Sequence, residues 1–310
     1  MTRELAFDAV RDAFESVAMN RSEVFDVVIG SGLRDNEIFG VKSGTDIKNR
    51  MVGLKVGTYW GGNAEKGLPA HGSTILLLDP DTGVPQVLVS ASYLNGYRTA
   101  AADAVAVSFL ARSDAAVLGV IGAGHQAEHE IRAVAEVRNL SLIKVFTRSE
   151  TRASWLADRL ADIAIEIQFT GAEAAVRGSD IVVTATPSKQ PLVRDEWVSE
   201  GTHISAMGAD TQGKHELDTA IMKRASLFAE YPQQSIRIGE FQHAYGEGLI
   251  DSAASVCALG LVTLGHSPGR TSDAELTVFD SSGIAIQDLA MAAAVYEAAT
   301  QKGLVQFIEL

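Results

Sequence analysis

Cysteine is almost absent from this chain of 310 residues: Cys257 is the only one, so no disulfide can form within the chain. Basic residues are also scarce, with 26 Lys and Arg against 39 Asp and Glu, and the formal charge of −13 would repel nucleic-acid phosphates and anionic membranes. The longest nearly uncharged apolar stretch, 252–265, is shorter than the roughly twenty residues of a membrane-spanning helix. We therefore expect no nucleic-acid partner and no membrane segment.

The first residues do not resemble a signal peptide, because Arg3, Glu4 and Asp8 stand where an apolar core is needed. Together with the scarcity of cysteine, this predicts a cytoplasmic protein. A hydrophobic content of 46% in 310 residues is enough for about two domains. No Cys or His spacing predicts a metal site.

The pattern of apolar and polar residues along the sequence changes near residue 113. Residues 2–18 carry a one-sided apolar stripe typical of a surface helix, and 25–90 contain short β-prone runs broken by Gly, Asn and Asp. These features predict a helix, a mostly antiparallel sheet and then a helix over 91–111. Beyond residue 113, short apolar strands alternate with helical stretches, which is the βαβ pattern of a doubly wound parallel sheet.

A glycine-rich turn follows the first of these later strands, in the order Gly122-Ala123-Gly124-His125-Gln126-Ala127. Gly122 permits a tight turn, Gly124 lets the backbone approach a pyrophosphate, and Ala127 keeps the following helix close to the strand. This context predicts a dinucleotide site. The predicted fold is α/β: a Rossmann-type doubly wound parallel sheet over 112–282, plus a smaller, mostly antiparallel α+β domain formed from 1–111 and 283–310.

The second strand of this domain ends without the carboxylate that usually binds the ribose of NAD. Arg148, flanked by the hydroxyls of Thr147 and Ser149, could instead hold the 2′-phosphate of NADP through charge-assisted hydrogen bonds. An NAD enzyme would also tolerate an arginine that is solvated or stacked on adenine. We predict an NAD(P) cofactor, with a preference for NADP(H).

Candidate chemical groups come from both domains. Thr186 and Met207 follow later parallel strands, and Asp210 follows a Gly-Ala turn, where it could transfer a proton or cap a helix. Lys55 has apolar neighbours on both sides, as expected either for an edge residue or for a functional lysine with a lowered pKa. Arg98 could bind a carboxylate or form a structural salt bridge.

Several motifs in order and spacing resemble the ornithine cyclodeaminase/mu-crystallin family over nearly the whole chain. They include Gly53-Leu54-Lys55, NxxxGLP, RTAAA, IGAGHQA, GADTQGKHELD and FDSSGIAIQDLA. FGVKSG, GLKVGTYWGGN and HGST look most like the iminosuccinate reductase branch of this family. The resemblance implies a substrate-binding and dimerisation domain built from both chain ends, and hence a homodimer.

The resemblance also implies roles for individual residues. Lys55 would contact the substrate carboxylate or imine, Arg98 would lie between substrate and cofactor, and Asp210 would be the acid/base. Substrate contacts are also expected from Lys42, His71 and Ser282. The expected cofactor contacts are Arg98, Thr99, Gly122, Gly124, His125, Gln126, Thr147, Arg148, Ser149, Thr186, Met207, Gly208, Lys214 and Ser281.

Two departures from the family pattern concern the N-terminal part. The family usually has a strand before the first helix, which has no counterpart here. It also usually has an arginine in the first strand of the sheet, and residues 25–29, which we expect to form that strand, contain none. A substrate-carboxylate contact is thus missing or moved, for example to Lys42 or His71.

Three functions are compatible with these features. The first is an NAD(P)H-dependent reductase of a small imino acid, or the reverse amino acid dehydrogenase, with iminosuccinate giving L-aspartate. The second is a cyclodeaminase of a diamino acid such as ornithine with tightly bound NAD, and the third is a non-catalytic, mu-crystallin-like ligand-binding protein. The set of Lys55, Arg98 and Asp210 favours an enzyme, and the absence of an acid at Thr147 favours reduction.

Overall fold

The computed structural model describes residues 2–308. The chain forms two compact units: a terminal unit, made of the residues up to Arg98 and those from Ile284 on, and a central unit, Thr99–Gly283. Each unit has a sheet of its own.

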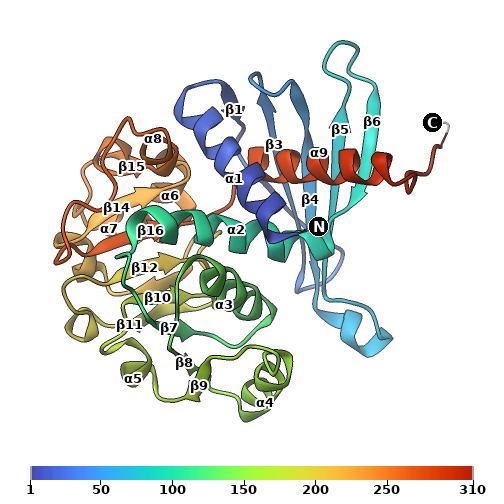
Figure 1. Cartoon of the computed structure of the whole chain (residues 1–310). Helices are drawn as coiled ribbons and strands as arrows, with labels where there is room; N and C mark the ends of the chain where they lie inside the picture. Colours follow the sequence, from blue (N-terminus) through green and yellow to red (C-terminus); the bar gives the residue numbers. More distant parts are fainter. Residues whose placement is uncertain (1, 309–310) are drawn as a thin grey trace. The chain divides into compact units, whose positions relative to one another are not determined.

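The terminal unit contains a six-stranded antiparallel sheet, as the sequence predicts (Figure 1). Its strands lie in the order β1-β3-β4-β5-β6, with β2 paired to β3. The bounds are β1 Ser22–Val24, β2 Val28–Ser31, β3 Glu37–Asp46, β4 Met51–Trp60, β5 His71–Leu78 and β6 Pro85–Ser90, with the 3₁₀ turn η1 Gly61–Lys66 after β4.

One face of this sheet is covered by the C-terminal helix α9 (Ala285–Gln301), which lies across the strands in Figure 1, and by the first helix, α1 (Arg3–Ala18). Ile75 and Leu77 of β5 point to this face and pack with Leu289 of α9 in one buried cluster. A Cβ at Gly53 of β4 would lie 2.2 Å from the Leu76 carbonyl oxygen and 3.0 Å from Leu289. Glycine at this position therefore lets α9 approach the sheet closely.

The other face of the sheet is apolar but not fully buried. Strands alternate their side chains between faces, so the residues that point away from α9 form a set of their own. Its half-buried or exposed members include Val41, Val52, Leu54, Val56, Leu76 and Leu88.

The central unit contains eight parallel strands in the order β15-β14-β16-β12-β10-β7-β8-β9, which confirms the predicted doubly wound sheet. The strands are β7 Val117–Ile121, β8 Leu142–Phe146, β9 Glu166–Phe169, β10 Ile181–Thr184, β12 His203–Ala206, β14 Ser226–Ala229, β15 Cys257–Ala258 and β16 Thr277–Asp280. A separate parallel pair is formed by β11 Lys189–Val193 and β13 His215–Leu217. Every residue of β10, β12 and β16 is buried, as expected where helices cover both faces.

Helices and 3₁₀ turns connect these strands. They are α3 His125–Val137, α4 Glu150–Arg159, α5 Ala172–Val176, η2 Asp195–Trp197, η3 Thr219–Lys223, α6 Pro232–Ile238, α7 Gln242–Gly246, η4 Ala253–Ser255 and α8 Leu259–Thr263.

The division between the units falls at Arg98, inside helix α2 (Ser92–Leu110), rather than at residue 111 as the sequence analysis places it. The last turns of α2 are bound to the central unit by two arginines. Arg138 donates to the carbonyls of Val107 and Ala111, and Arg270 donates to that of Leu110.

Candidate active site

The predicted dinucleotide turn follows β7 and has the geometry of a pyrophosphate cradle. Gly122 has φ 121°, which disfavours any residue with a side chain, and a Cβ there would lie 2.7 Å from the Ala185 carbonyl oxygen. Gly124 is the N-cap of α3, and nothing lies within 4 Å of the place where its Cβ would be. The first amides of α3 are therefore not covered by a capping side chain, and they fit a phosphate group.

This turn also lies where ligands bind in doubly wound sheets. β7 is flanked by β8 on one side and β10 on the other, so the chain changes direction across the sheet at this strand. The predicted adenosine-side residues follow β8. Arg148 is exposed, whereas Ser149 caps α4 by accepting from the Arg152 amide at 3.3 Å and thus has a structural role as well.

The loops after β10 and β12 carry the predicted nicotinamide-side residues. Thr186 and Gly208 both bind the buried carboxylate of Glu216, which the sequence analysis did not single out. Asp210 is half-exposed and forms an ion pair with Lys214 at 2.5 Å, and Lys214 also donates to the Gly208 carbonyl at 3.1 Å. Lys214 thus fixes the Asp210 loop from within.

Two further predicted residues, Ser281 and Ser282, lie directly after β16 and are buried. Ser281 donates to Glu230 at 3.1 Å, and Ser282 accepts from Gln234 at 2.9 Å. Both hydroxyls are therefore engaged within the central unit.

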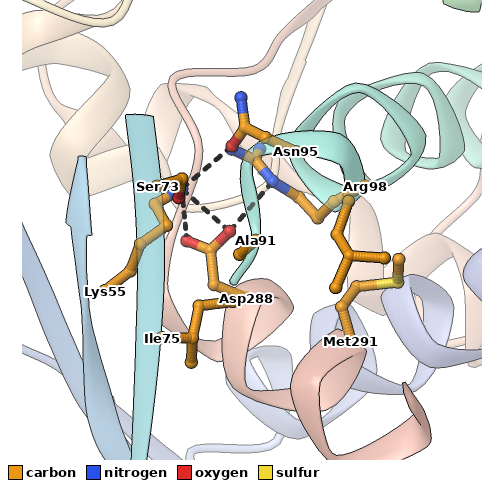
Figure 2. A pocket seen from close by; sticks show the side chains of 9 residues that line it. Lys55, Ser73, Ile75, Ala91, Asn95, Arg98, Asp288 and Met291 are labelled. Atoms are coloured by element: carbon orange, nitrogen blue, oxygen red, sulfur yellow. Dashed lines mark hydrogen bonds and ion pairs between the residues drawn. The ribbon is translucent and has the colours of Figure 1, made fainter. Parts of the chain in front are cut away.

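The terminal unit gathers Lys55 and Arg98 around a carboxylate, Asp288, which the sequence analysis also missed (Figure 2). Lys55 Nζ lies 2.7 Å from Asp288 Oδ2, and Arg98 Nε lies 3.3 Å from Asp288 Oδ1. Lys55 also donates to the Asn95 side-chain oxygen at 3.2 Å. The three charged residues are 7%, 6% and 2% exposed, so their charges act in a medium that screens them weakly.

Burial and charge shift the pKa values of this group in a consistent way. Burial lowers the pKa of Lys55 to about 8; Asp288 opposes this shift, and the positive charges of Arg98 and Lys42 add to it. Burial raises the pKa of Asp288, but Lys55, Arg98 and Lys42 outweigh it and hold this pKa below its ordinary value. Asp288 is therefore a carboxylate at neutral pH.

The pocket around this group contains a polar atom without a partner. The Ser73 hydroxyl oxygen is shielded from solvent and has no hydrogen-bond partner among the residues described. Ser73 and Lys55 line the same pocket (Figure 2). A shielded, unsatisfied hydroxyl costs free energy, and a bound carboxylate oxygen would satisfy it.

Of the other two predicted substrate residues, Lys42 is near Lys55 and His71 is not. Lys42 stands directly opposite Lys55 in the β3–β4 register. His71 is exposed and stands opposite Tyr59, and the centroids of the two rings are 4.9 Å apart. His71 precedes Ile75, the register partner of Lys55, by four residues, which places it about 13 Å away along the strand. The structure thus does not bring His71 into the Lys55 group.

Asp288 left a signal in the sequence. It is a carboxylate within an otherwise apolar stretch of α9, and a charge buried on such a helix needs partners of opposite sign. Glu216 is harder to recognise as a buried carboxylate from the sequence. Its strand, β13, has only three residues, which are too few to show a pattern of buried and exposed positions.

Comparison with known proteins identifies the family of this chain. The model of the ornithine cyclodeaminase/mu-crystallin family matches residues 3–303. The chain is 42% identical to the iminosuccinate reductase of Paracoccus denitrificans, over 100% of this chain and 96% of that protein.

Two solved structures of related enzymes are similar over the whole chain. The crystal structure of the Paracoccus denitrificans enzyme in complex with NAD+ has a TM-score of 0.94 at 41% identity, covering 100% of this chain and 96% of that one. An archaeal alanine dehydrogenase dimer with bound NAD has a TM-score of 0.93 at 35% identity, covering 100% and 95%. This chain belongs to the ornithine cyclodeaminase/mu-crystallin family.

Proposed function

We propose that this protein is an NAD(P)H-dependent reductase of a small imino acid, working in reverse as an amino acid dehydrogenase, with iminosuccinate as substrate and L-aspartate as product. The observation that carries the proposal is the buried group of Lys55, Arg98 and Asp288 in a chain that also has a dinucleotide turn. The similarity to an iminosuccinate reductase supports the choice of substrate.

The charges of this group suit a substrate with two carboxylates. Three basic side chains, those of Lys55, Arg98 and Lys42, act on the Asp288 carboxylate and lower its pKa. In a protein with a formal charge of −13, such a cluster of basic residues is needed to attract a dianion such as iminosuccinate. Arg98 offers a planar fork of donors for one carboxylate, and the Ser73 hydroxyl offers a further contact.

The chemistry divides between the cofactor and the chain. When bound, the reduced dinucleotide supplies the hydride that turns the imine carbon into an amine-bearing carbon. The Gly122–Gly124 turn binds the pyrophosphate, while Lys55 and Arg98 hold the substrate carboxylates. Asp210, directly or through a water that it orients, delivers the proton to the imine nitrogen, and Lys214 holds Asp210 in place.

The cofactor preference that we propose is for NADP(H), through Arg148. This residue is exposed at the carboxyl end of β8, and no carboxylate occupies the ribose-binding position beside it. The two related structures described above contain NAD, so NADPH and NADH must be compared directly.

We also propose a cytoplasmic homodimer. The half-buried apolar face of the terminal unit offers a surface for a second copy, and the archaeal relative is described as a dimer. Cytoplasmic location rests on the single cysteine, which allows no disulfide within the chain. No helix within residues 2–308 has both the length and the apolar character to cross a membrane.

The decisive experiment follows the absorbance of NADPH and NADH with oxaloacetate plus ammonia as the source of iminosuccinate, and with pyruvate plus ammonia for comparison. We expect rapid, ammonia-dependent oxidation of the cofactor with oxaloacetate. Release of ammonia from ornithine without net cofactor oxidation would instead identify a cyclodeaminase. Cofactor binding without turnover on any of these substrates would identify a ligand-binding protein.

A further inference from the structure

The loops after three neighbouring strands of the central unit, β7, β10 and β12, pack on one another. A Cβ at Gly122, after β7, would lie 2.7 Å from the Ala185 carbonyl oxygen, after β10. A Cβ at Gly208, after β12, would lie 2.3 Å from the Thr186 carbonyl oxygen. The position of the dinucleotide turn therefore depends on the loop after β10, and that loop depends on the loop after β12.

Glu216 joins the second and third of these loops with a single buried carboxylate. Its Oε1 accepts from the Thr186 amide at 2.8 Å and from the Thr186 hydroxyl at 2.7 Å. Its Oε2 accepts from the Gly208 amide at 2.9 Å and from the Thr184 hydroxyl at 2.8 Å. Four donors fill the acceptor positions of an ionised carboxylate, and Glu216 has no exposed surface.

We propose that Glu216 is a positioning residue, which fixes the Thr186 and Gly208 loops in the conformation that binds the nicotinamide half of the dinucleotide. The inference rests on the proposed function, in which the turn after β7 binds the pyrophosphate. The carboxyl ends of β10 and β12 then lie on the side of the switch point where the rest of the ligand extends. Loops at such an edge are mobile unless hydrogen bonds hold them, and both of these loops donate hydrogen bonds to the Glu216 carboxylate.

The surroundings of Glu216 keep its carboxylate in place. The amides of Glu216 and Leu217 both donate to Glu240, at 2.9 and 2.7 Å, and the Glu240 amide donates to Asp280 at 2.9 Å. Burial and the nearby Glu216 charge raise the pKa of Glu240 well above its ordinary value. Burial raises the pKa of Glu216 as well, but the four donors to its carboxylate oppose this shift and favour the charged form.

The variant Glu216→Gln tests the proposal, because a side-chain amide has one accepting oxygen and cannot accept from both loops. We measure the Kd of NADH by fluorescence and the Kd of ADP, which lacks the nicotinamide half, by calorimetry. We expect the NADH affinity to fall at least about tenfold, as for a lost hydrogen bond to a charged group, and the ADP affinity to stay within about twofold.

Asp180→Asn is the matched control. Asp180 directly precedes the same strand, β10, and so lies at the amino-terminal end of the strands, away from the dinucleotide turn. Its carboxylate also accepts hydrogen bonds from two backbone amides, those of Ala116 and Val117. We expect this variant to lose stability without any change in the ratio of NADH to ADP affinity. A general effect of removing a carboxylate from this sheet would change the ratio in both variants and would overturn the proposal.

Equal losses of NADH and ADP affinity in Glu216→Gln, or no loss in a folded protein, would also overturn it. If Glu216→Gln does not fold, Thr184→Val decides, because it removes one donor to Glu216 at nearly constant shape. A selective fall of about threefold in NADH affinity is then expected, and an unchanged affinity would refute the proposal. These are binding measurements, so they stand apart from the imine-reduction assay: wild-type protein that binds NADH without reducing imines would disprove the proposed function alone.

Discussion

Lys55 is the residue that we propose to bind the substrate carboxylate in the terminal unit. Burial lowers its pKa to about 8, so it loses its charge within the pH range of ordinary assays. A lysine is positive below its pKa, so an anion binds best below about pH 8 and progressively worse above it. We expect the Kd of succinate, which has two carboxylates and no amine, to rise about tenfold per pH unit well above pH 8. In Lys55→Arg, which stays charged, the Kd should not change with pH; a wild-type Kd that is also constant up to pH 10 would contradict the assignment.

Lys55 and Asp210 should differ in how they affect catalysis. Lys55→Ala removes a contact that is present in both the ground state and the transition state, so it should raise KM and lower kcat together. Asp210→Asn keeps the shape of the side chain and loses proton transfer. It also weakens the half-exposed ion pair with Lys214, while the contact of Lys214 with the Gly208 carbonyl remains. It should lower kcat by about 10² to 10⁴ with little change in KM or cofactor affinity. Steady-state kinetics decides, and an Asp210→Asn enzyme with most of its activity would show that another group carries the proton.

Arg148 should set the cofactor preference. Arg148→Ala removes a charge-assisted contact with the 2′-phosphate, worth about 1.5 to 3 kcal/mol, so the NADPH affinity should fall at least about tenfold. The NADH affinity should hardly change, because NADH has no 2′-phosphate. Fluorescence titration with both cofactors measures this, and equal losses would mean that Arg148 acts on the part that the two cofactors share.

At the scale of elements, the packing of α9 on the terminal sheet brings Asp288 to Lys55. Gly53 makes this packing possible, because a Cβ there would lie 2.2 Å from a backbone oxygen of β5, which cannot easily move. We expect Gly53→Ala to lower the free energy of unfolding by about 1 to 3 kcal/mol, as for other overpacked sites. Urea unfolding measures the change.

Gly57→Ala is the control for this prediction. Gly57 lies on the same strand and the same face, and nothing lies within 4 Å of its would-be Cβ. This variant should change the stability by only a few tenths of a kcal/mol relative to wild type. Similar losses of stability in both variants would mean that the glycines of β4 are needed for the strand itself and not for the contact with α9.

At the scale of the whole molecule, the apolar face of the terminal sheet predicts self-association. Light scattering at micromolar concentration should give twice the 32.9 kDa mass of one chain. Leu54→Asp places a charge on this face and should yield monomers. Leu33→Asp, at a fully exposed loop position, should leave the dimer intact; a monomeric wild-type protein would refute the prediction.

The sequence by itself determined the features that depend on neighbours along the chain. Thr2 caps α1 by accepting from the Leu5 amide, and Asp79 to Gly83 form the loop between β5 and β6, as their side-chain chemistry predicts. The turn at Gly122 follows its strand and opens a helix for the same reason: a few consecutive residues specify it. The alternation of strands and helices likewise predicted the parallel sheet.

Only the tertiary structure decided which charged residues meet. Asp288 lies 233 positions after Lys55, and no local pattern shows that α9 will bring them within hydrogen-bond distance. Glu216 binds two loops that come from different strands, and His71 is removed from Lys55 by strand register although both residues lie in adjacent strands. The partners of a buried charge depend on which elements pack together, because the free energy that selects them comes from burial across the whole unit and not from the residues beside it.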